Sequence, residues 1–388
     1  MTTSPSHRAL DRIAAQMRAR PVAWRRVEGG YTAAERWVLQ LDDGRSLFAK
    51  LATNDNTVRW IRAEHFVYER IAGDFLPRLL GFDDGDYPLL LLEDLSGGSW
   101  YHEWTAANVQ RVCDLLARVA ATKLPADFPI AKAPLDGFIG WQGIAKAPEE
   151  FLALGLVTPA WLAHALPALL AAEAALDFSG DALLHFDVRS DNLCFLPDGR
   201  TILVDWNWAG RGNAAFDLIG WLPSLQAEGG PAPWTILPDA GPAMVTALCG
   251  YFAVRAGAPP QGSPIRNLQT AQLKCALPWT ARVLDLPPPG NQQTRRRPMK
   301  MKNANAMKNG WSVAVSGQSS NGVPKTRHYV VAIEDEAKAL SAVEAVIEKA
   351  EVATISSPVG ANLLELRNIL PGEVRMLGGA VRRRPAGT

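Results

Sequence analysis

The sequence predicts an α+β protein with a small strand-rich N-terminal part, a larger and mainly helical middle part, and a small α/β unit at its C-terminus. Two observations lead to this fold class. Apolar runs of strand length dominate residues 20–95, whereas apolar residues at helical spacing dominate residues 105–286. The segment Leu286-Pro287-Pro288-Pro289-Gly290 then ends the helical part, because proline cannot continue a helix.

The N-terminal part contains a predicted β-hairpin followed by a helix. The apolar runs Trp37–Leu41 and Ser46–Leu51 flank Asp42-Asp43-Gly44-Arg45, a combination typical of a hairpin. Apolar residues recur at helical spacing from about Val58 to Ala72, which predicts a helix there. The next apolar run, Pro88–Leu92, predicts a further strand.

The C-terminal unit alternates between strand and helix patterns. Trp311–Val315 and Tyr329–Ile333 predict strands, and Glu334–Ala350 predicts a helix. Val352–Ile355 predicts a third strand, and Ala361–Ile369 a second helix. These elements would form a small α/β appendage.

We therefore divide the chain into four segments. Residues 1–94 form the strand-rich part, and residues 95–290 form the helical part. Residues 291–310 carry basic side chains and no acidic ones, which predicts a solvated basic linker. Residues 311–388 form the appendage, whose role the sequence does not indicate.

Charge does not point to a polyanionic partner. The 388 residues include 40 Lys and Arg against 39 Asp and Glu, a net charge of +1. Residues 291–388 hold +7, from 15 basic and 8 acidic residues, which leaves −6 for residues 1–290. No aromatic residues interleave the basic run, so we do not expect nucleic acid as a partner.

Cysteine usage and hydropathy favour a cytoplasmic protein. The four cysteines are scattered and no histidines cluster beside them, which argues against zinc and favours a reducing compartment. The polar segment Met1–Arg20 does not have the form of a secretory signal. The apolar stretch Phe151–Leu176 contains prolines, a histidine and a glutamate, so we expect buried helices and no membrane partner. The sequence does not indicate an oligomeric state.

The most informative pattern is a second predicted hairpin, around Pro197-Asp198-Gly199-Arg200. With a four-residue loop, Leu196 lies opposite Thr201, and counting back places Asn192 opposite Asp205. Directly opposed residues have Cβ atoms about 5 Å apart. A carboxylate and an amide oxygen held in this way suit Mg²⁺.

Asp187 precedes Asn192 by five residues, within reach of the same site. Phosphoryl transfer needs a carboxylate that accepts the proton of the acceptor hydroxyl, and the H-x-D-x-x-x-x-N spacing has the form of a kinase catalytic loop. Upstream, Lys50 ends an apolar strand and Glu64 lies on the next helix, so an ion pair between them would hold the ammonium group for phosphate. Glu69 on the same helix is the alternative partner for Lys50, and we favour Glu64.

Taken together, these segments resemble the aminoglycoside phosphotransferase and choline kinase family. The resemblance covers about residues 20–290 and does not include the appendage. It implies a two-lobed protein-kinase-like fold, with ATP in the cleft and phosphorylation of a small-molecule hydroxyl. The segments that carry it are Phe48-Ala49-Lys50, Ala63-Glu64, Leu91-Leu92-Glu93-Asp94-Leu95, His185-Phe186-Asp187-Val188-Arg189-Ser190-Asp191-Asn192, Val204-Asp205-Trp206-Asn207 and Gly212–Leu218.

The family resemblance implies a role for each matching residue. Asp187 would be the catalytic base, with Asn192 and Asp205 as Mg²⁺ ligands. Lys50 would bind phosphate, and Glu64 would position Lys50.

The resemblance also implies that the backbone of Leu92, Glu93 and Asp94 contacts the adenine. Three features depart from the family pattern. Asn207 stands where the family often has an acidic residue. Phe186 stands where the family usually has glycine, and Gly29-Gly30-Tyr31-Thr32 lacks a full glycine-rich pattern for covering phosphate. These departures keep a second hypothesis open, an inactive kinase-fold protein with a binding or regulatory role, although the retained catalytic groups argue against it.

Two other enzyme classes are weighed against this interpretation. Gly210–Ala215 matches G-x-G-x-x-A, but the acidic residue and the strands of a dinucleotide-binding unit are missing downstream. The sequence has no G-x-x-x-x-G-K-[ST] segment, which excludes a P-loop enzyme.

The phosphate acceptor is not readable from the sequence. Between Leu95 and Gly290, 17 acidic and 12 basic residues permit a cationic or neutral substrate, so an aminoglycoside, an amino alcohol and a sugar all stay open. Five tryptophans could line an acceptor pocket, but we expect most of them in the core. They are Trp141, Trp161, Trp221, Trp234 and Trp279.

Overall fold

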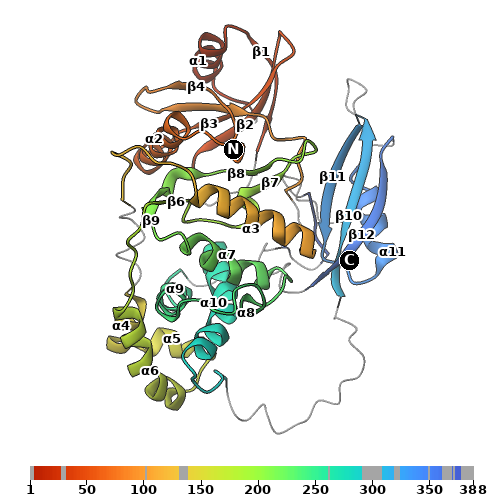
Figure 1. Cartoon of the computed structure of the whole chain (residues 1–388). Helices are drawn as coiled ribbons and strands as arrows, with labels where there is room; N and C mark the ends of the chain where they lie inside the picture. The colour runs from red at the N-terminus through yellow and green to blue at the C-terminus, as the bar shows by residue number, and fades with distance from the viewer. Residues whose placement is uncertain are drawn as a thin grey trace.

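Within the segments that the computed structural model describes, the chain forms a strand-rich N-terminal lobe, a helical C-terminal lobe and a small α/β unit (Figure 1). This is the three-part α+β architecture that the sequence predicts. The described residues are 4–27, 32–100, 103–130, 139–260, 263–290, 308–318, 324–347, 350–360, 369 and 372–376.

A five-stranded antiparallel sheet with the order β1-β2-β3-β5-β4 forms the N-terminal lobe. The hairpin β2–β3 and strand β5 occupy the predicted positions. Strands β1 and β4 were not predicted, because β1 is largely exposed and β4 is only half-buried, so neither has a clear apolar pattern. The strands are β1 (Pro21–Arg26), β2 (Glu35–Leu41), β3 (Ser46–Leu51), β4 (Leu79–Asp83) and β5 (Leu89–Glu93).

The two faces of this sheet pack against different helices. Helix α1 (His7–Met17) packs with Leu47 and Ala49 of β3. Successive side chains of a strand point to opposite faces, so Lys50 lies on the other face, with helix α2 (Asp55–Arg70). A capping box fixes the start of α2, which begins three residues before the predicted helix and ends two residues before its predicted end.

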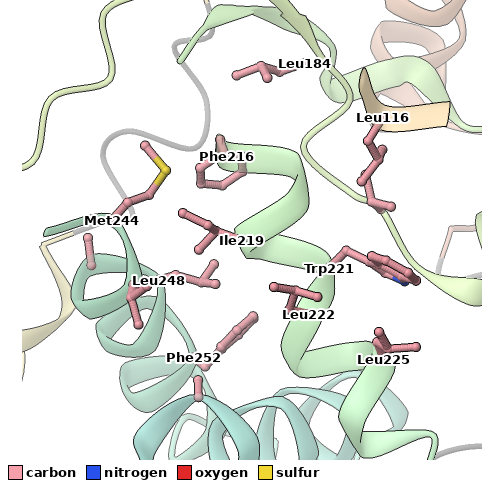
Figure 2. Packing of buried hydrophobic residues seen from close by; sticks show 14 of the residues in the cluster. Leu116, Leu184, Phe216, Ile219, Trp221, Leu222, Leu225, Met244, Leu248 and Phe252 are labelled. Carbon is pink, nitrogen blue, oxygen red and sulfur yellow. The ribbon is translucent and has the colours of Figure 1, made fainter. Parts of the chain in front are cut away.

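The C-terminal lobe consists mainly of helices around a buried central helix, α7. Most residues of α7 are buried, as expected for a helix that is apolar on all sides. Figure 2 shows Ile219 and Leu222 facing Leu248 of α9, whereas Trp221 points to another side of α7. The helices are α3 (Ala106–Ala120), α4 (Gly140–Lys146), α5 (Glu149–Ala153), α6 (Pro159–Ala174), α7 (Phe216–Ala227), α8 (Pro233–Ile236), α9 (Pro242–Ala256) and α10 (Pro264–Val283).

Short strands and turns between α6 and α7 carry the candidate catalytic residues. Strand β6 (Ala182–Leu184) pairs antiparallel with β9 (Gly210–Gly212), which leaves no βαβ unit there and contradicts the dinucleotide-binding alternative. Strands β7 (Leu193–Phe195) and β8 (Thr201–Leu203) form the predicted second hairpin. The 3-10 turns η2 (Ser190–Asn192) and η3 (Trp206–Trp208) adjoin this hairpin.

In the α/β unit, a four-stranded antiparallel sheet has the order β12-β10-β11-β13. Its core includes Trp311, Val313 and Tyr329, packed with Val343 of helix α11. The elements are β10 (Lys308–Gln318), β11 (Pro324–Val331), α11 (Glu336–Glu344), β12 (Val352–Gly360) and β13 (Val374–Met376).

Three details of this unit differ from the sequence prediction. Strand β10 begins at Lys308, inside the segment predicted as linker, and α11 ends at Glu344, before the predicted end at Ala350. Strand β13 was not predicted. The rest of the predicted linker, residues 291–307, and almost all of the predicted helix Ala361–Ile369 lie outside the described residues.

The apolar stretch Phe151–Leu176 is divided between α5 and α6, with a break before Pro159. Among the described residues, no helix combines the length and apolar character needed to span a membrane. The five tryptophans lie where we expect them: Trp141, Trp161, Trp221 and Trp279 are buried, and Trp234 is partly buried against the same core.

Candidate active site

The register of the β7–β8 hairpin differs from the predicted one. Leu193 pairs with Leu203, and the amide of Val204 donates to the carbonyl of Asn192 at 2.9 Å. Asn192 is therefore level with Val204, and the predicted direct opposition of Asn192 and Asp205 was wrong by one residue.

A three-residue loop, Pro197-Asp198-Gly199, accounts for this shift. The Leu196 amide donates to the carbonyl of Arg200 at 2.9 Å, and the Gly199 amide donates to the Leu196 carbonyl at 3.1 Å. Gly199 has φ +92°, a left-handed conformation that glycine adopts without a steric penalty. A turn followed by a left-handed glycine is a common three-residue hairpin loop, so Arg200 belongs to the ladder and not to the loop.

Asp205 reaches the cleft by a local change of backbone direction. It has φ 65° and ψ 55°, a left-handed conformation that is rare outside glycine, asparagine and aspartate. The turn at Asp205 ends strand β8 and starts η3. Asp205 Oδ1 lies 2.5 Å from Lys50 Nζ, across the two lobes.

Lys50 forms ion pairs with two carboxylates. Its Nζ lies 2.6 Å from Glu64 Oε2 and 2.5 Å from Asp205 Oδ1. Lys50 is 4% exposed and Glu64 1%, so both charges depend on these partners. Tyr68 also donates to Glu64 Oε1 at 3.0 Å. Glu69, the competing glutamate, pairs with Arg70 at the surface.

The charges in this cluster set its protonation states. Burial alone would lower the pKa of Lys50, but the charges of Asp205 and Glu64 outweigh burial and raise it. Burial alone would raise the pKa of Asp205, but Lys50 outweighs it and lowers this pKa to about 2. Lys50 is therefore a cation and Asp205 an anion at neutral pH.

Asp217 anchors the start of the loop between β6 and η2. The amides of His185 and Phe186 donate to the two oxygens of this carboxylate, at 2.7 and 2.9 Å. Phe186 has φ 66°, so the family's usual glycine at this position has a physical reason: the backbone is left-handed here. The Phe186 ring packs on Phe216, with centroids 4.7 Å apart.

His185 holds the same loop from inside. Its Nδ1 accepts from the Asp187 amide at 3.2 Å, so the proton lies on Nε2, which donates to the Val204 carbonyl at 2.8 Å. Burial lowers the pKa of His185 to about 4. A neutral ring fits both bonds, so His185 has the structural role that these contacts describe.

Asp187 lies beside Arg189 and Asn192. Arg189 donates to Asp187 Oδ1 and also to the carboxylate of Asp191, at 2.9 Å from its Nε. The Asn192 amide nitrogen donates to the Asp187 carbonyl at 2.8 Å and to Oδ2 at 3.3 Å. Burial raises the pKa of Asp187, and Asp191 and Asp205 act in the same direction, whereas Arg189 opposes them. A raised pKa makes this carboxylate a stronger base than an exposed aspartate.

The segment predicted to contact adenine lies at the end of β5. Leu92 is buried on the sheet, and the Asp94 carboxylate accepts from the Ser96 amide at 2.9 Å. Glu93 binds Arg200 of the β7–β8 hairpin, with Nη2 and Oε1 2.7 Å apart. The side chains of Glu93 and Asp94 thus hold the segment in place. The predicted phosphate-covering residues Gly29, Gly30 and Tyr31 lie outside the described residues.

Sequence reasoning missed Arg36. On β2 it pairs directly with Lys50 on β3, and it is 9% exposed. Arg36 donates to Thr32 Oγ1 and, at 3.2 Å, to the Ala34 carbonyl. Counting residues back from the predicted β2–β3 turn leads to a position close to Arg36. The loop has three residues, and this length sets the register that places Arg36 opposite Lys50.

The oxygen donors of the site fit a hard cation. The amide nitrogen of Asn192 donates to Asp187, so the amide oxygen is the atom that can bind a metal. Asp205 is ionised at neutral pH. Within the described segments, no group of three His, Cys, Asp or Glu is placed to hold a metal. One carboxylate plus one amide suits Mg²⁺, which is commonly held by few protein ligands and by substrate phosphates.

A family model described as the phosphotransferase enzyme family matches residues 23–243, more than half of the chain. The chain belongs to this family. It is therefore a phosphotransferase by family, and its strand-rich and helical lobes are those of the two-lobed kinase-like fold that the resemblance implied. The matched range includes both lobes' candidate residues, from Lys50 to Asp205, and leaves the α/β unit outside.

Solved structures of related phosphotransferases are similar to this chain. Choline kinase LicA from Streptococcus pneumoniae has 13% identity and a TM-score of 0.48, covering 71% of this chain and 100% of its own. An aminoglycoside phosphotransferase from Alicyclobacillus acidocaldarius has 14% identity and a TM-score of 0.47, covering 74% and 96%. A thermostable mutant of aminoglycoside phosphotransferase APH(4)-Ia, in a ternary complex with AMP-PNP and hygromycin B, has 14% identity and a TM-score of 0.49, covering 70% and 97%. No curated protein matches the sequence of this chain.

Proposed function

We propose that this phosphotransferase moves the γ-phosphoryl group of ATP, with Mg²⁺, to a hydroxyl of a small molecule. The observation that carries the proposal is the bridge from Lys50 to Glu64 and Asp205, which joins the lobes at the point where we propose that phosphate binds. We further propose a cytoplasmic location, because the four cysteines, all within described segments, are free thiols.

In this proposal Asp187 is the base. Its carboxylate accepts the proton of the acceptor hydroxyl as the new O–P bond forms and the bond to the leaving ADP oxygen breaks. Its raised pKa favours this transfer. Arg189, which donates to Asp187, limits its basicity and keeps the carboxylate in one orientation.

Lys50 binds the phosphates of the nucleotide, and Glu64 holds Lys50 in place. Arg36, directly across the strand pair, adds a second positive charge on the same face of the sheet. Asn192 and Asp205 would hold Mg²⁺, which neutralises phosphate oxygens as charge shifts to the leaving group. The backbone of Leu92–Asp94 would contact the adenine.

The acceptor belongs to the small molecules with a free hydroxyl. The related structures include a choline kinase and an aminoglycoside phosphotransferase with bound hygromycin B, and we propose the same range for this chain: an aminoglycoside, an amino alcohol or a sugar.

The first experiment is a thermal-shift titration with ATP, with and without Mg²⁺, and then a radiolabelled-ATP screen of hydroxyl acceptors. ATP binding at a hundredfold excess over Kd stabilises the folded state by about 2.7 kcal/mol. We expect a Mg²⁺-dependent rise in Tm and transfer to at least one acceptor class. No rise with any nucleotide would contradict the proposal and favour a binding or regulatory role.

The variant Asp187→Asn tests the base. It keeps the size of the side chain and removes the proton acceptor, so we expect transfer to fall by a factor of about 10² to 10⁴ while ATP binding persists. Asp181→Asn is the matched control, because the Asp181 side chain is exposed and its nearest ion-pair distance, to Arg211, is 3.6 Å. Unchanged transfer in Asp187→Asn would reject the assignment of the base.

A further inference from the structure

Helix α7 carries a carboxylate at each end, and each one binds a different half of the catalytic loop. Asp217, in its first turn, accepts the amides of His185 and Phe186. Glu228 lies directly after its last residue, and its Oε1 accepts the hydroxyl of Ser190. Because α7 is the buried centre of the C-terminal lobe, both carboxylates are attached to a rigid element.

The environment of Glu228 fixes the orientation of its carboxylate. Its second oxygen, Oε2, accepts the indole N–H of Trp104 at 3.1 Å. Trp104 in turn packs edge-on against Trp221 of α7, with ring centroids 5.5 Å apart. Ser190 is 3% exposed, so its hydroxyl is held away from water. A buried hydroxyl bound to a carboxylate forms a charge-assisted hydrogen bond, stronger than a bond between neutral groups.

Ser190 begins the turn η2, and Asn192 ends it. The Asn192 backbone amide donates to the Arg189 carbonyl at 3.0 Å, which closes this turn. The Asn192 side chain then donates to Asp187. A continuous series of contacts therefore runs from α7 through Glu228 and Ser190 to Asn192 and the candidate base.

We infer that Glu228 is a positioning residue for Asn192 and acts through the hydroxyl of Ser190. The inference rests on the proposed function, in which Asn192 binds Mg²⁺. Glu228 fixes the start of η2, so that the Asn192 amide nitrogen stays on Asp187 and its oxygen faces the cation. Partners that orient a metal ligand typically change metal affinity or activity by about 10- to 100-fold when removed.

Nucleotide binding without metal depends on other residues. Lys50 and the segment at the end of β5 belong to the N-terminal lobe, whereas the Ser190–Glu228 bond lies in the C-terminal lobe. Loss of the Ser190–Glu228 bond should therefore raise the Mg²⁺ requirement and leave metal-free ATP binding unchanged.

The test measures the Mg²⁺ concentration that gives half of the ATP-dependent rise in Tm of the full chain. Ser190→Ala and Glu228→Ala, which removes the acceptor of the Ser190 hydroxyl, should each raise it by about tenfold. The double variant should be no worse than either single variant, because both remove the same bond. Ser190→Thr keeps a hydroxyl and should restore the wild-type value. Trp104→Phe is the matched control: it keeps an aromatic ring, removes the bond to Oε2, and should change the value less than Ser190→Ala does.

A lower Tm without a changed Mg²⁺ requirement in Ser190→Ala and Glu228→Ala would overturn the inference, because a purely structural bond would act in that way. Additive effects in the double variant would overturn it too. If the wild-type chain shows no Mg²⁺-dependent shift with ATP, the proposed function fails first, and this outcome is distinguishable because it precedes any comparison of variants.

Discussion

The β2–β3 hairpin of the N-terminal lobe and the β7–β8 hairpin of the C-terminal lobe turn through the same pattern, Leu-x-Asp-Gly-Arg. In each, the third loop residue is a left-handed glycine: Gly44 with φ +85° and Gly199 with φ +92°. Their amides donate to the leucine carbonyl at 3.1 Å in both turns. Asp43 binds the amide and guanidinium of Arg45 as Asp198 binds those of Arg200.

The two hairpins differ beyond the turn. Strand β3 lies between β2 and β5 and continues in regular geometry to Lys50. Strand β8 pairs with β7 and is only three residues long, and the chain turns left-handed at Asp205. Lys50 and Asp205 each come five residues after the turn arginine, and they meet across the lobes. The same turn sequence is thus followed by a cation in one lobe and by an anion in the other. The pairing of each strand with its neighbours determines the backbone conformation that places the charged side chain.

The largest expected effects come from the residues at the far ends of the hairpins. Under the proposed function, Lys50→Met and Asp205→Ala should each lower transfer by about 10²-fold or more, because each removes a charge that would contact phosphate or metal. Only Lys50→Met leaves Glu64 buried without its cation, so it should cost about 3–5 kcal/mol of unfolding free energy. Urea denaturation measures this cost.

Lys50→Met combined with Glu64→Gln should recover much of the lost stability, since no buried charge is then left unpaired. Glu69→Gln, on the exposed surface of α2, is the control and should match the wild type. Equal losses of unfolding free energy in Lys50→Met and Asp205→Ala would contradict the predicted difference between the two hairpin ends.

Acid should weaken the C-terminal hairpin, whose end is tied to His185 through the Val204 carbonyl. The folded pKa of about 4 lies below the ordinary value, so the neutral ring contributes stability that is present above pH 6.5 and is lost as pH falls toward 4. The loss should reach roughly 3 kcal/mol. Asp217, whose pKa burial raises to about 6, acts in the opposite direction over this range. The measurement is therefore the difference between wild type and His185→Gln in urea unfolding from pH 7 to 4.

His185→Gln keeps a donor for the Val204 carbonyl and has no titratable ring. A wild-type curve parallel to that of the variant would show that His185 does not couple this hairpin to pH.

The two turn arginines should differ in their contribution to stability. Arg200 also binds the buried carboxylate of Glu93, whereas Arg45, whose side chain is exposed, otherwise donates to the Met17 carbonyl. Arg200→Ala should cost about 2 kcal/mol, typical of hydrogen bonds to a charged group, and Arg45→Ala about 0.5 kcal/mol. Thermal unfolding compares them, and equal costs would mean that the Glu93 contact adds nothing.

The smallest effects should come from the two glycines. A Cβ at Gly44 or Gly199 meets no atom within 4 Å, so alanine costs only the left-handed backbone penalty of about 1 kcal/mol. Because the turns share one geometry, the two costs should agree to within about 0.5 kcal/mol in chemical denaturation. A large difference would show that the turns are alike only in sequence.

Much of the site was predictable because its residues have local signals. Lys50 ends an apolar strand, and Asp187 and Asn192 have a recognisable spacing. The register of the β7–β8 hairpin was not predicted correctly, because the choice between a three- and a four-residue loop depends on the left-handed conformation of Gly199. The left-handed turn at Asp205 has only a weak signal in the sequence, because aspartate adopts the extended and helical conformations as well.

Long-range contacts could not be predicted from the sequence either, because they depend on the tertiary arrangement. Ser190 meets Glu228, 38 residues later, only because α7 crosses the lobe between them. Strand β1 escaped prediction because most of its side chains are exposed and need no apolar pattern.

The ion pair between Lys50 and Asp205 has a consequence for the order of binding under the proposed function. The ammonium group occupies the carboxylate that a cation would use, so a free metal ion must compete with it. A polyphosphate gives Lys50 another anion and releases Asp205 for the metal. Linkage requires the benefit to be mutual: the factor by which nucleotide increases metal affinity equals the factor by which metal increases nucleotide affinity. Under the proposed function, Lys50 would thus be a counterion that lowers the affinity of Asp205 for free metal until the nucleotide binds.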